Sequence, residues 1–310
     1  RPDKIKEALA TVNLDTLPNR FFLIQVDDYY NYSSKMQITQ EFYQKTMLIN
    51  LLRERMRELG LKGFMANLVG IDKLICFLCC EDEEKTDIHN YLSKIAESFK
   101  EAVRSQSDYT ISICISQRCN RIWQYSQMHP NMNLALNKSY FSGKEFSIFL
   151  SDVEQHVPMK ETSLNNFYPE LIAAFSRSSP SQMECVLQSM MQVLLEGQLN
   201  PQEAKMELIR LLHKINDYGI RCGIPKQQMK DCSKKAIAQI LSCSFIADTR
   251  KYFMEFFYSF THILNEANTG TEYLFKIPVS EYIETHYMEN IRLGTLSSLI
   301  GFSEGHFTRV

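Results

Sequence analysis

Residues 277–310 read IPVSEYIETHYMENIRLGTLSSLIGFSEGHFTRV, a pattern that predicts three helices in close succession. Apolar side chains recur at helical spacing in residues 279–290 and again in residues 293–300, so each of these two helices is expected to bury one face. The side chains expected on these faces are Val279, Tyr282, Ile283 and Tyr287 in the first helix, and Leu293, Leu296, Leu299 and Ile300 in the second.

A tight turn is expected between the second and third helices. Ser297 is small enough for a crossing helix to approach closely, and Gly301 is placed to end the second helix with a positive φ. Phe302 is expected to fill the corner, and Ser303 is a favourable N-cap for the third helix. Helix, tight glycine turn and helix is the shape that enters the major groove of DNA.

This segment resembles the first helix-turn-helix of the AraC-type transcription regulators, with residues 279–290 as the opening helix of that DNA-binding domain. The resemblance rests on the run LxxLSxxIGFSxxHFxRV in residues 293–310. Three positions depart from the family pattern: Arg292 replaces the usual Ser or Thr N-cap, Gly294 weakens the following helix, and Ser297 replaces an alanine. The alternative is a surface helical hairpin that only resembles this motif, in a chain that is an interaction scaffold.

The resemblance implies DNA-binding roles for residues of the third helix. Gly305, Thr308 and Arg309 take the groove-facing positions, and Ser303 lies at the helix N-terminus, where backbone N–H groups and the helix dipole favour a phosphate. Because Gly305 has no side chain to read a base, Arg309 is the main candidate for a base contact. The implied partner is promoter DNA, bound by the paired DNA-binding domains of a homodimer.

Composition places these expectations in a cellular context. The 310 residues begin at Arg1 without a methionine and end at Val310, inside the expected recognition helix, so we expect them to be part of a longer chain. No apolar run approaches the roughly 18 residues that cross a bilayer, and no signal peptide is visible. Nine scattered cysteines, an odd number, favour a reducing compartment. We expect a cytoplasmic location, either as a free protein or as the cytoplasmic part of a membrane-tethered one.

Charge and motifs argue against several kinds of chemistry. The net charge is −2, and residues 278–310 hold more glutamate than arginine, so this segment alone should bind DNA poorly. Cys76, Cys79 and Cys80 are spaced like a metal or redox motif, but they follow one another in an apolar strand without a second ligand pair, which favours buried strand cysteines. No Ser-His-Asp order, Walker loop, GxGxxG or HExxH is present. We expect no catalytic residue, metal or cofactor.

Strands and helices alternate in the first half of the chain. Residues 1–18 predict the end of a connector helix that arrives from an upstream domain, and residues 19–152 predict a mixed domain. Its expected elements are strand 21–26, helix 36–59, hairpin strands 63–69 and 73–80, helix 88–104, strand 110–116, a helical segment 123–139 interrupted at Pro130, and strand 147–150. This order suggests an α+β fold with a ferredoxin-like sheet and helices on one face.

The same domain resembles, in a degenerate form, the GGDEF domain of diguanylate cyclases. The likeness lies at the strand end 26–29, the hairpin turn 69–74 and the strand 110–116. Joining two GTP molecules needs carboxylates that hold metal against phosphate and a glycine turn for the nucleotide. Here Gln25 takes the first carboxylate position, Ile71 replaces a glycine and Lys73 replaces an acid, while Asp72 remains. We expect a signal-relaying domain without enzyme activity; the alternative is a nucleotide-binding sensor or a diguanylate-cyclase-like enzyme.

Residues 160–275 predict a helical domain. Its five helices are expected near 162–177, 181–197, 201–220, 225–243 and 248–266. Ser179 and Asn200 each precede a proline at the first helical position, and Glu203 completes a capping box after Asn200. The aromatic residues of segment 252–260 recur at helical spacing, which predicts bundle core or a dimer face rather than a ligand pocket.

The sequence as a whole predicts a fragment of an AraC-type transcription regulator. A degenerate GGDEF-like domain (19–152) precedes a helical domain (160–275) and the opening half of a DNA-binding domain (277–310). An upstream receiver or membrane-tethered sensor domain is expected to change their orientation or dimerisation, so that paired DNA-binding domains engage a promoter. The sequence identifies neither the small-molecule effector nor the operator.

Overall fold

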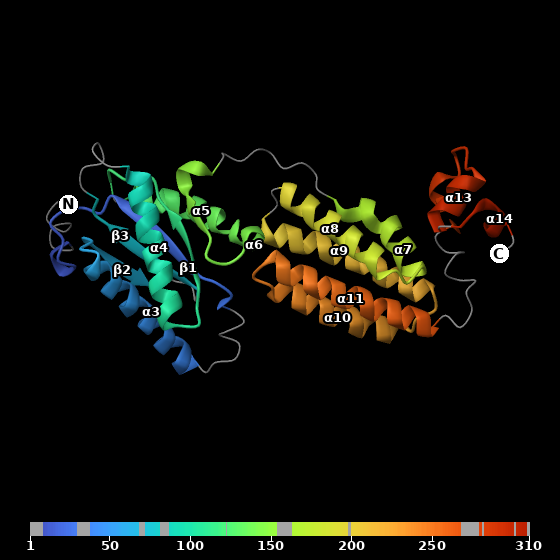
Figure 1. The fold of residues 1–310 in the computed structure, drawn as a ribbon, viewed down its shortest axis with the longest axis horizontal. Coiled ribbons are helices and arrows are strands. Elements are labelled where there is room, and N and C mark those ends of the chain that lie inside the picture. Colours follow the sequence, from blue (N-terminus) through green and yellow to red (C-terminus); the bar gives the residue numbers. More distant parts are fainter. Residues whose placement is uncertain are drawn as a thin grey trace. The chain divides into compact units, whose positions relative to one another are not determined.

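The computed structural model describes residues 9–29, 38–67, 72–80, 87–121, 123–153, 163–197, 200–267, 279–280, 282–300 and 302–308. The chain forms two compact units, Arg1–Val157 and Pro158–Val310. The first contains a five-stranded sheet with helices, and the described residues of the second are helical (Figure 1). The predicted α+β class is confirmed at this level. Of the predicted connector helix, residues 9–11 are helical and residues 1–8 lie outside the described part.

The sheet of the first unit has the strand order β2-β3-β1-β4-β5. Along the chain, its elements are β1 (Arg20–Val26), α3 (Ile38–Glu58), β2 (Gly63–Asn67), β3 (Lys73–Leu78), α4 (Ile88–Gln106), β4 (Ile111–Ile115), α5 (Gln124–Leu136), α6 (Ser139–Ser142) and β5 (Ser147–Phe149). Strand β1 is antiparallel to both of its neighbours, β3 and β4, whereas β5 runs parallel to β4. The central position of β1 brings its end close to the ends of β3 and β4.

Both faces of this sheet are covered, so the prediction of helices on one face is wrong. Phe22 and Ile24 of β1 join a core with α3 and α4, which Figure 1 shows in front of the sheet, whereas Phe21 and Leu23 join a second core with α5. Successive side chains of a strand point to opposite faces. A strand buried on both faces is therefore apolar without alternation, as these four consecutive residues of β1 are.

Helix α5 continues through Pro130, where the sequence predicts an interruption. The proline ring removes one helical hydrogen bond and leaves the carbonyl of Ser126 without its usual donor. Both residues are exposed, so water can donate to that carbonyl. The apolar residues on the opposite side of α5, Met132, Ala135 and Leu136, are buried against the sheet and hold the helix together.

The short strand β5 is attached to helix α4 at both of its ends. Before β5, the guanidinium of Arg104 pairs with the carboxylate of Glu145 at 2.8 Å. At the last residue of β5, the Phe149 ring stacks on the His89 ring with centroids 3.7 Å apart, and after the strand Asp152 Oδ2 lies 3.6 Å from His89 Nε2. These side chains supplement the few ladder hydrogen bonds that a three-residue strand can form with β4.

The second unit is built from helices with well-defined starts. They are α7 (Tyr168–Ser176, preceded by a 3₁₀ turn Leu164–Phe167), α8 (Pro180–Glu196), α9 (Pro201–Arg221), α10 (Lys226–Ser242) and α11 (Ile246–Ala267), followed by two short helices described below. The predicted caps are confirmed. The hydroxyl of Ser179 accepts from the backbone N–H of Gln182, and Asn200 Oδ1 accepts from the N–H of Glu203 at 2.9 Å, while the Glu203 carboxylate accepts from the N–H of Asn200.

The aromatic residues of α11 form the centre of this bundle. Phe253, Phe256, Phe257 and Phe260 are buried, and the ring of Phe260 lies 4.8 Å from that of Phe175 in α7. Segment 252–260 was predicted to form either bundle core or a dimer face, and these four side chains form bundle core.

One buried lysine of the second unit is paired, and a buried thiol of the first unit is kept neutral. Lys205 of α9 donates from Nζ to the carbonyls of Leu241 and Cys243 at 3.0 and 2.6 Å, so it closes the end of α10, and its burial lowers the pKa of the ammonium. In the sheet, burial raises the pKa of the Cys114 thiol to about 12. Cys76 is buried in β3 as predicted, whereas Cys79 and Cys80 follow the strand and are half-buried.

Candidate nucleic-acid interface

The opening helix of the C-terminal segment is shorter than predicted. Residues 279–280 and 282–286 are helical, and the chain turns at residues 287–289. The ring of Tyr282 stacks on that of His286, with centroids 4.1 Å apart. Tyr282 is half-buried, but Ile283 is 41% and Tyr287 69% exposed, so the prediction that these two side chains lie on the buried face is wrong. For Tyr287 the cause is the early end of the helix, because this residue no longer follows the helical period, whereas Ile283 is helical and lies outside the narrow buried face.

Helix α13 (Leu293–Ile300) buries a narrow face. Ser297 and Ile300 are each 2% exposed, as expected for a small residue at a helix crossing and for an apolar anchor. Leu296 and Leu299 are half-buried, whereas Leu293, at the first residue of the helix, is exposed, so the prediction that it lies on the buried face is wrong. The hydroxyl of Ser297 donates to the carbonyl of Gly294 at 3.1 Å, which satisfies this buried polar group within its own helix.

A closed turn leads from α13 to α14 (Glu304–Phe307). The backbone N–H of Phe302 donates to the carbonyl of Ser297 at 2.8 Å, a bond that reverses the chain at the end of α13. Gly301, predicted to end this helix, lies outside the described residues. The N–H of Phe307 then donates to the carbonyl of Ser303 at 2.9 Å, which begins the next helix where the sequence predicts it. The helix–turn–helix path itself is present.

The predicted contact residues gather on this short second helix. Ser303, Gly305 and Thr308 are exposed, and the Thr308 hydroxyl donates to the carbonyl of Glu304 at 3.2 Å. Arg309, the predicted base-reading residue, lies outside the described residues. What the structure describes is therefore an exposed helix surface of small and hydroxyl side chains, next to a buried supporting helix.

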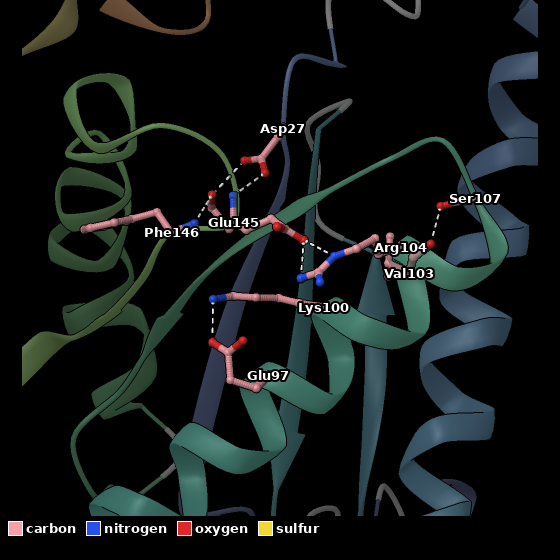
Figure 2. A network of polar contacts seen from close by, with 9 residues as sticks. Asp27, Glu97, Lys100, Val103, Arg104, Ser107, Glu145 and Phe146 are labelled. Atoms are coloured by element: carbon pink, nitrogen blue, oxygen red, sulfur yellow. Dashed lines mark hydrogen bonds and ion pairs between the residues drawn. The ribbon is translucent and has the colours of Figure 1, made fainter.

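A second polar site lies at the end of β1, where the sequence resembles a metal-binding strand end. Asp27 is 3% exposed. One carboxylate oxygen accepts from the hydroxyl of Ser112 at 2.6 Å, and the other accepts from the backbone N–H of Glu145 at 2.9 Å (Figure 2). The Ser112 hydroxyl in turn accepts from the N–H of Phe146 at 3.1 Å. Both oxygens of Asp27 are thus engaged with protein donors.

The arrangement ties three distant parts of the chain together. Asp27 follows β1, Ser112 belongs to β4, and Glu145 precedes β5 in the left-handed conformation, with φ 58°. Figure 2 shows Arg104 of α4 reaching the Glu145 carboxylate from the other side. No sequence motif predicts this network. Its one signal is a hydroxyl residue in the otherwise apolar strand ISICI, since a buried hydroxyl needs a hydrogen-bond partner.

The other positions of the resembled nucleotide site are engaged in the sheet or lie outside the described part. Gln25 stands opposite Lys73 in the β1–β3 ladder, and Lys73 Nζ donates to Asn133 Oδ1 of α5 at 2.6 Å. The backbone carbonyl of Asp72 accepts from the N–H of Val26. Ile71 lies outside the described residues. Within those residues, no group of three His, Cys, Asp or Glu side chains is arranged to hold a metal ion.

No protein family, curated protein or solved structure matches this chain. Every helix in the described segments is too short or too polar to cross a lipid bilayer.

Proposed function

We propose that this chain is part of a sequence-specific DNA-binding transcription regulator. The observation that carries the proposal is the path from α13 to α14: a helix with a buried Ser297 and Ile300, a turn closed by the Phe302 N–H, and a second helix that starts after Ser303. Two helices joined by a three- to four-residue turn are the supersecondary unit that places its second helix in the major groove. The AraC-like run of residues 293–310 supports this assignment.

In this proposal the exposed face of α14 is the reading surface. Gly305, Thr308 and Arg309 face the groove, and Ser303 lies near a phosphate. The exposure of Ser303, Gly305 and Thr308 agrees with such a role, since none of the three is needed for the packing of α13. Arg309 supplies the base contact, because its guanidinium can donate two hydrogen bonds to a guanine. The protein acts as a homodimer on promoter DNA.

The first unit is proposed to relay a signal rather than to make a nucleotide product. Its βαββαβ order and the sheet order β2-β3-β1-β4 agree with the ferredoxin-like topology on which the GGDEF resemblance rests. The Asp27 carboxylate is engaged by Ser112 and Glu145, which supports a structural role for this residue of the strand end that resembles a metal-binding one. An upstream sensor or receiver domain supplies the input.

Substitution of Arg309 tests the proposal. Arg309→Ala should weaken binding to the protein's own promoter by about 1–3 kcal/mol and relax the preference at one base pair, the value of a bidentate arginine–guanine contact. Arg309→Lys should retain the charge and still lose that preference. Fluorescence titration on a panel of single-base variants of the promoter measures both effects, and Arg57→Ala, which removes an exposed arginine of α3, is the matched control.

If Arg309→Ala lowers affinity equally on every sequence of the panel, the arginine contacts phosphate and reads no base. If the protein shows no preference for its promoter over unrelated DNA at any salt concentration, the proposed function is wrong.

A further inference from the structure

One side of helix α10 carries three lysines spaced four residues apart, Lys226, Lys230 and Lys234, here called the lysine stripe. All three are exposed, and residues four apart lie on one helix face. With Lys235 and a single acid, Asp231, α10 has a net charge of +3 in a chain whose net charge is −2. Helices α7, α8 and α11 each hold more acidic than basic residues. Positive charge is therefore concentrated on α10.

The lysine stripe lacks the interleaved acids that a merely solvated helix face ordinarily has. The ion pairs formed among the described residues do not include any of its three ammonium groups. The one acid of α10, Asp231, accepts from the Gln227 amide at 3.1 Å through both of its oxygens. Alternating charges four residues apart stabilise exposed helices. Their absence here leaves a row of like charges that repel one another and favour an anionic partner.

The stripe begins at the end of the bundle from which the chain continues toward the helix-turn-helix. Helices α10 and α11 pack side by side and are joined by residues 243–245, so α10 begins toward the end of the bundle at which α11 ends, although the longer α11 extends past the start of α10. The end of α7 is at the same place, because Ser178 Oγ and Asn265 Oδ1 are 3.1 Å apart, and α13 contacts α7. Lys226 therefore lies toward the end of the bundle from which the chain continues to the candidate DNA-binding segment, and Lys230 and Lys234 follow one and two turns further along α10.

We propose that the lysine stripe contacts the phosphate backbone of DNA beside the site read by the helix-turn-helix; this inference rests on the proposed function. Phosphate contacts supply much of the affinity of DNA-binding proteins, and residues 278–310 provide few, with two arginines against four glutamates. The stripe extends over about 12 Å of helix, a length along which duplex DNA carries about seven phosphates. Because the apolar face of α10 is buried in the bundle, the helix is not built to insert into a lipid surface.

The test compares two triple variants of equal charge. One replaces the stripe (Lys226→Gln, Lys230→Gln and Lys234→Gln), and the control replaces three exposed lysines elsewhere with glutamine: Lys94, Lys138 and Lys251. Glutamine has nearly the helix propensity of lysine, and far-UV circular dichroism verifies that both variants fold. Affinity for the promoter and for an unrelated duplex of the same length is measured by fluorescence anisotropy between 0.05 and 0.3 M salt.

A plot of log affinity against log salt has a negative slope, and each lost phosphate contact should make this slope shallower by about 0.9. The same loss should reduce affinity at 0.1 M salt by about eightfold. The salt dependence of the stripe variant should be shallower by the amount of at least one phosphate contact. The change should be equal on both duplexes, because lysine–phosphate contacts carry no sequence information. The control should keep the parent slope. A stripe variant whose slope equals that of the control overturns the inference while leaving a promoter preference, and with it the proposed function, intact.

The same experiment can also support the phosphate contact while contradicting sequence-specific binding. If the parent protein binds both duplexes equally, and the salt dependence of the stripe variant is still shallower than that of the parent, the stripe contacts phosphate but the proposed function is wrong. Vesicles of phosphatidylserine are a further arm of the experiment. Loss of vesicle binding in the stripe variant, with unchanged DNA binding, would show that the surface serves an anionic membrane and that the inference is wrong.

Discussion

Replacement of Asp27 by alanine should destabilise the first unit by about 3–5 kcal/mol. The buried carboxylate accepts from the Ser112 hydroxyl at 2.6 Å and from the Glu145 N–H at 2.9 Å. A hydrogen bond to a charged group contributes about 1.5–3 kcal/mol, and its loss leaves a buried donor without an acceptor on each partner. Asp27→Asn retains the volume and one acceptor oxygen, so its cost should be about 1–2 kcal/mol.

The single tryptophan of the chain, Trp123, gives a specific readout because it belongs to the first unit. Its fluorescence follows urea unfolding of that unit separately from the helical unit. With a slope of about 2 kcal/mol per molar urea, Asp27→Ala should lower the midpoint by about 1.5–2.5 M. The matched control, Asp15→Ala, removes an exposed carboxylate of the same unit and should change stability by less than about 0.5 kcal/mol.

A destabilisation by Asp27→Ala no larger than that by Asp15→Ala would refute the structural role of the network. A double-mutant cycle with Ser112→Ala adds a second criterion, since two groups in direct contact should show a coupling energy of about 0.5–3 kcal/mol. The effect of magnesium on stability is the third criterion. A midpoint that rises on addition of Mg²⁺, and no longer does so in Asp27→Ala, would show that the carboxylate binds metal.

Two buried groups give further expectations. Burial raises the pKa of the Cys114 thiol to about 12 from 9.0, so between these values the folded state keeps a proton that the unfolded chain loses, and the free energy of unfolding should fall as pH rises. Cys114→Ala should reduce that slope by about 1.4 kcal/mol per pH unit in urea titrations at pH 9 and 11, and an unchanged slope would contradict this origin. Lys205→Met should lower the stability of the helical unit by about 2 kcal/mol, because the carbonyls of Leu241 and Cys243 lose a buried donor. Thermal unfolding followed by circular dichroism measures this, and a loss equal to that of the exposed Lys251→Met would argue against it.

The elements that sequence reasoning predicted well are those whose boundaries depend on local chemistry. Ser179 and Asn200, each followed by a proline, fix the starts of α8 and α9 because cap and proline act within one turn. The covering of both sheet faces was missed. Four consecutive apolar residues from Phe21 signal it, but the helix that covers the second face is α5, whose Pro130 made it look broken.

The candidate sites could be predicted only where they lie in one continuous stretch. The α13–α14 path is such a stretch, and its turn chemistry is visible in Ser303 and the residues before it. The network of Asp27, Ser112 and Glu145 is assembled from three separate parts of the chain, and no spacing rule relates them. The early end of the helix before Tyr287 was also missed, because residues 287–289 contain no glycine or proline that would signal a helix end.

The attachment of β5 has a mechanical consequence. The strand is the last of the first unit, lies at the edge of the sheet and pairs with β4 over three residues. A pull on the chain beyond residue 153 therefore loads the His89 stack on Phe149 first, then the short ladder, and only afterwards the Arg104–Glu145 pair. The unit would yield at its exit by stepwise detachment of β5, with the other four strands still intact, so tension on that side can lengthen the connection without unfolding the domain.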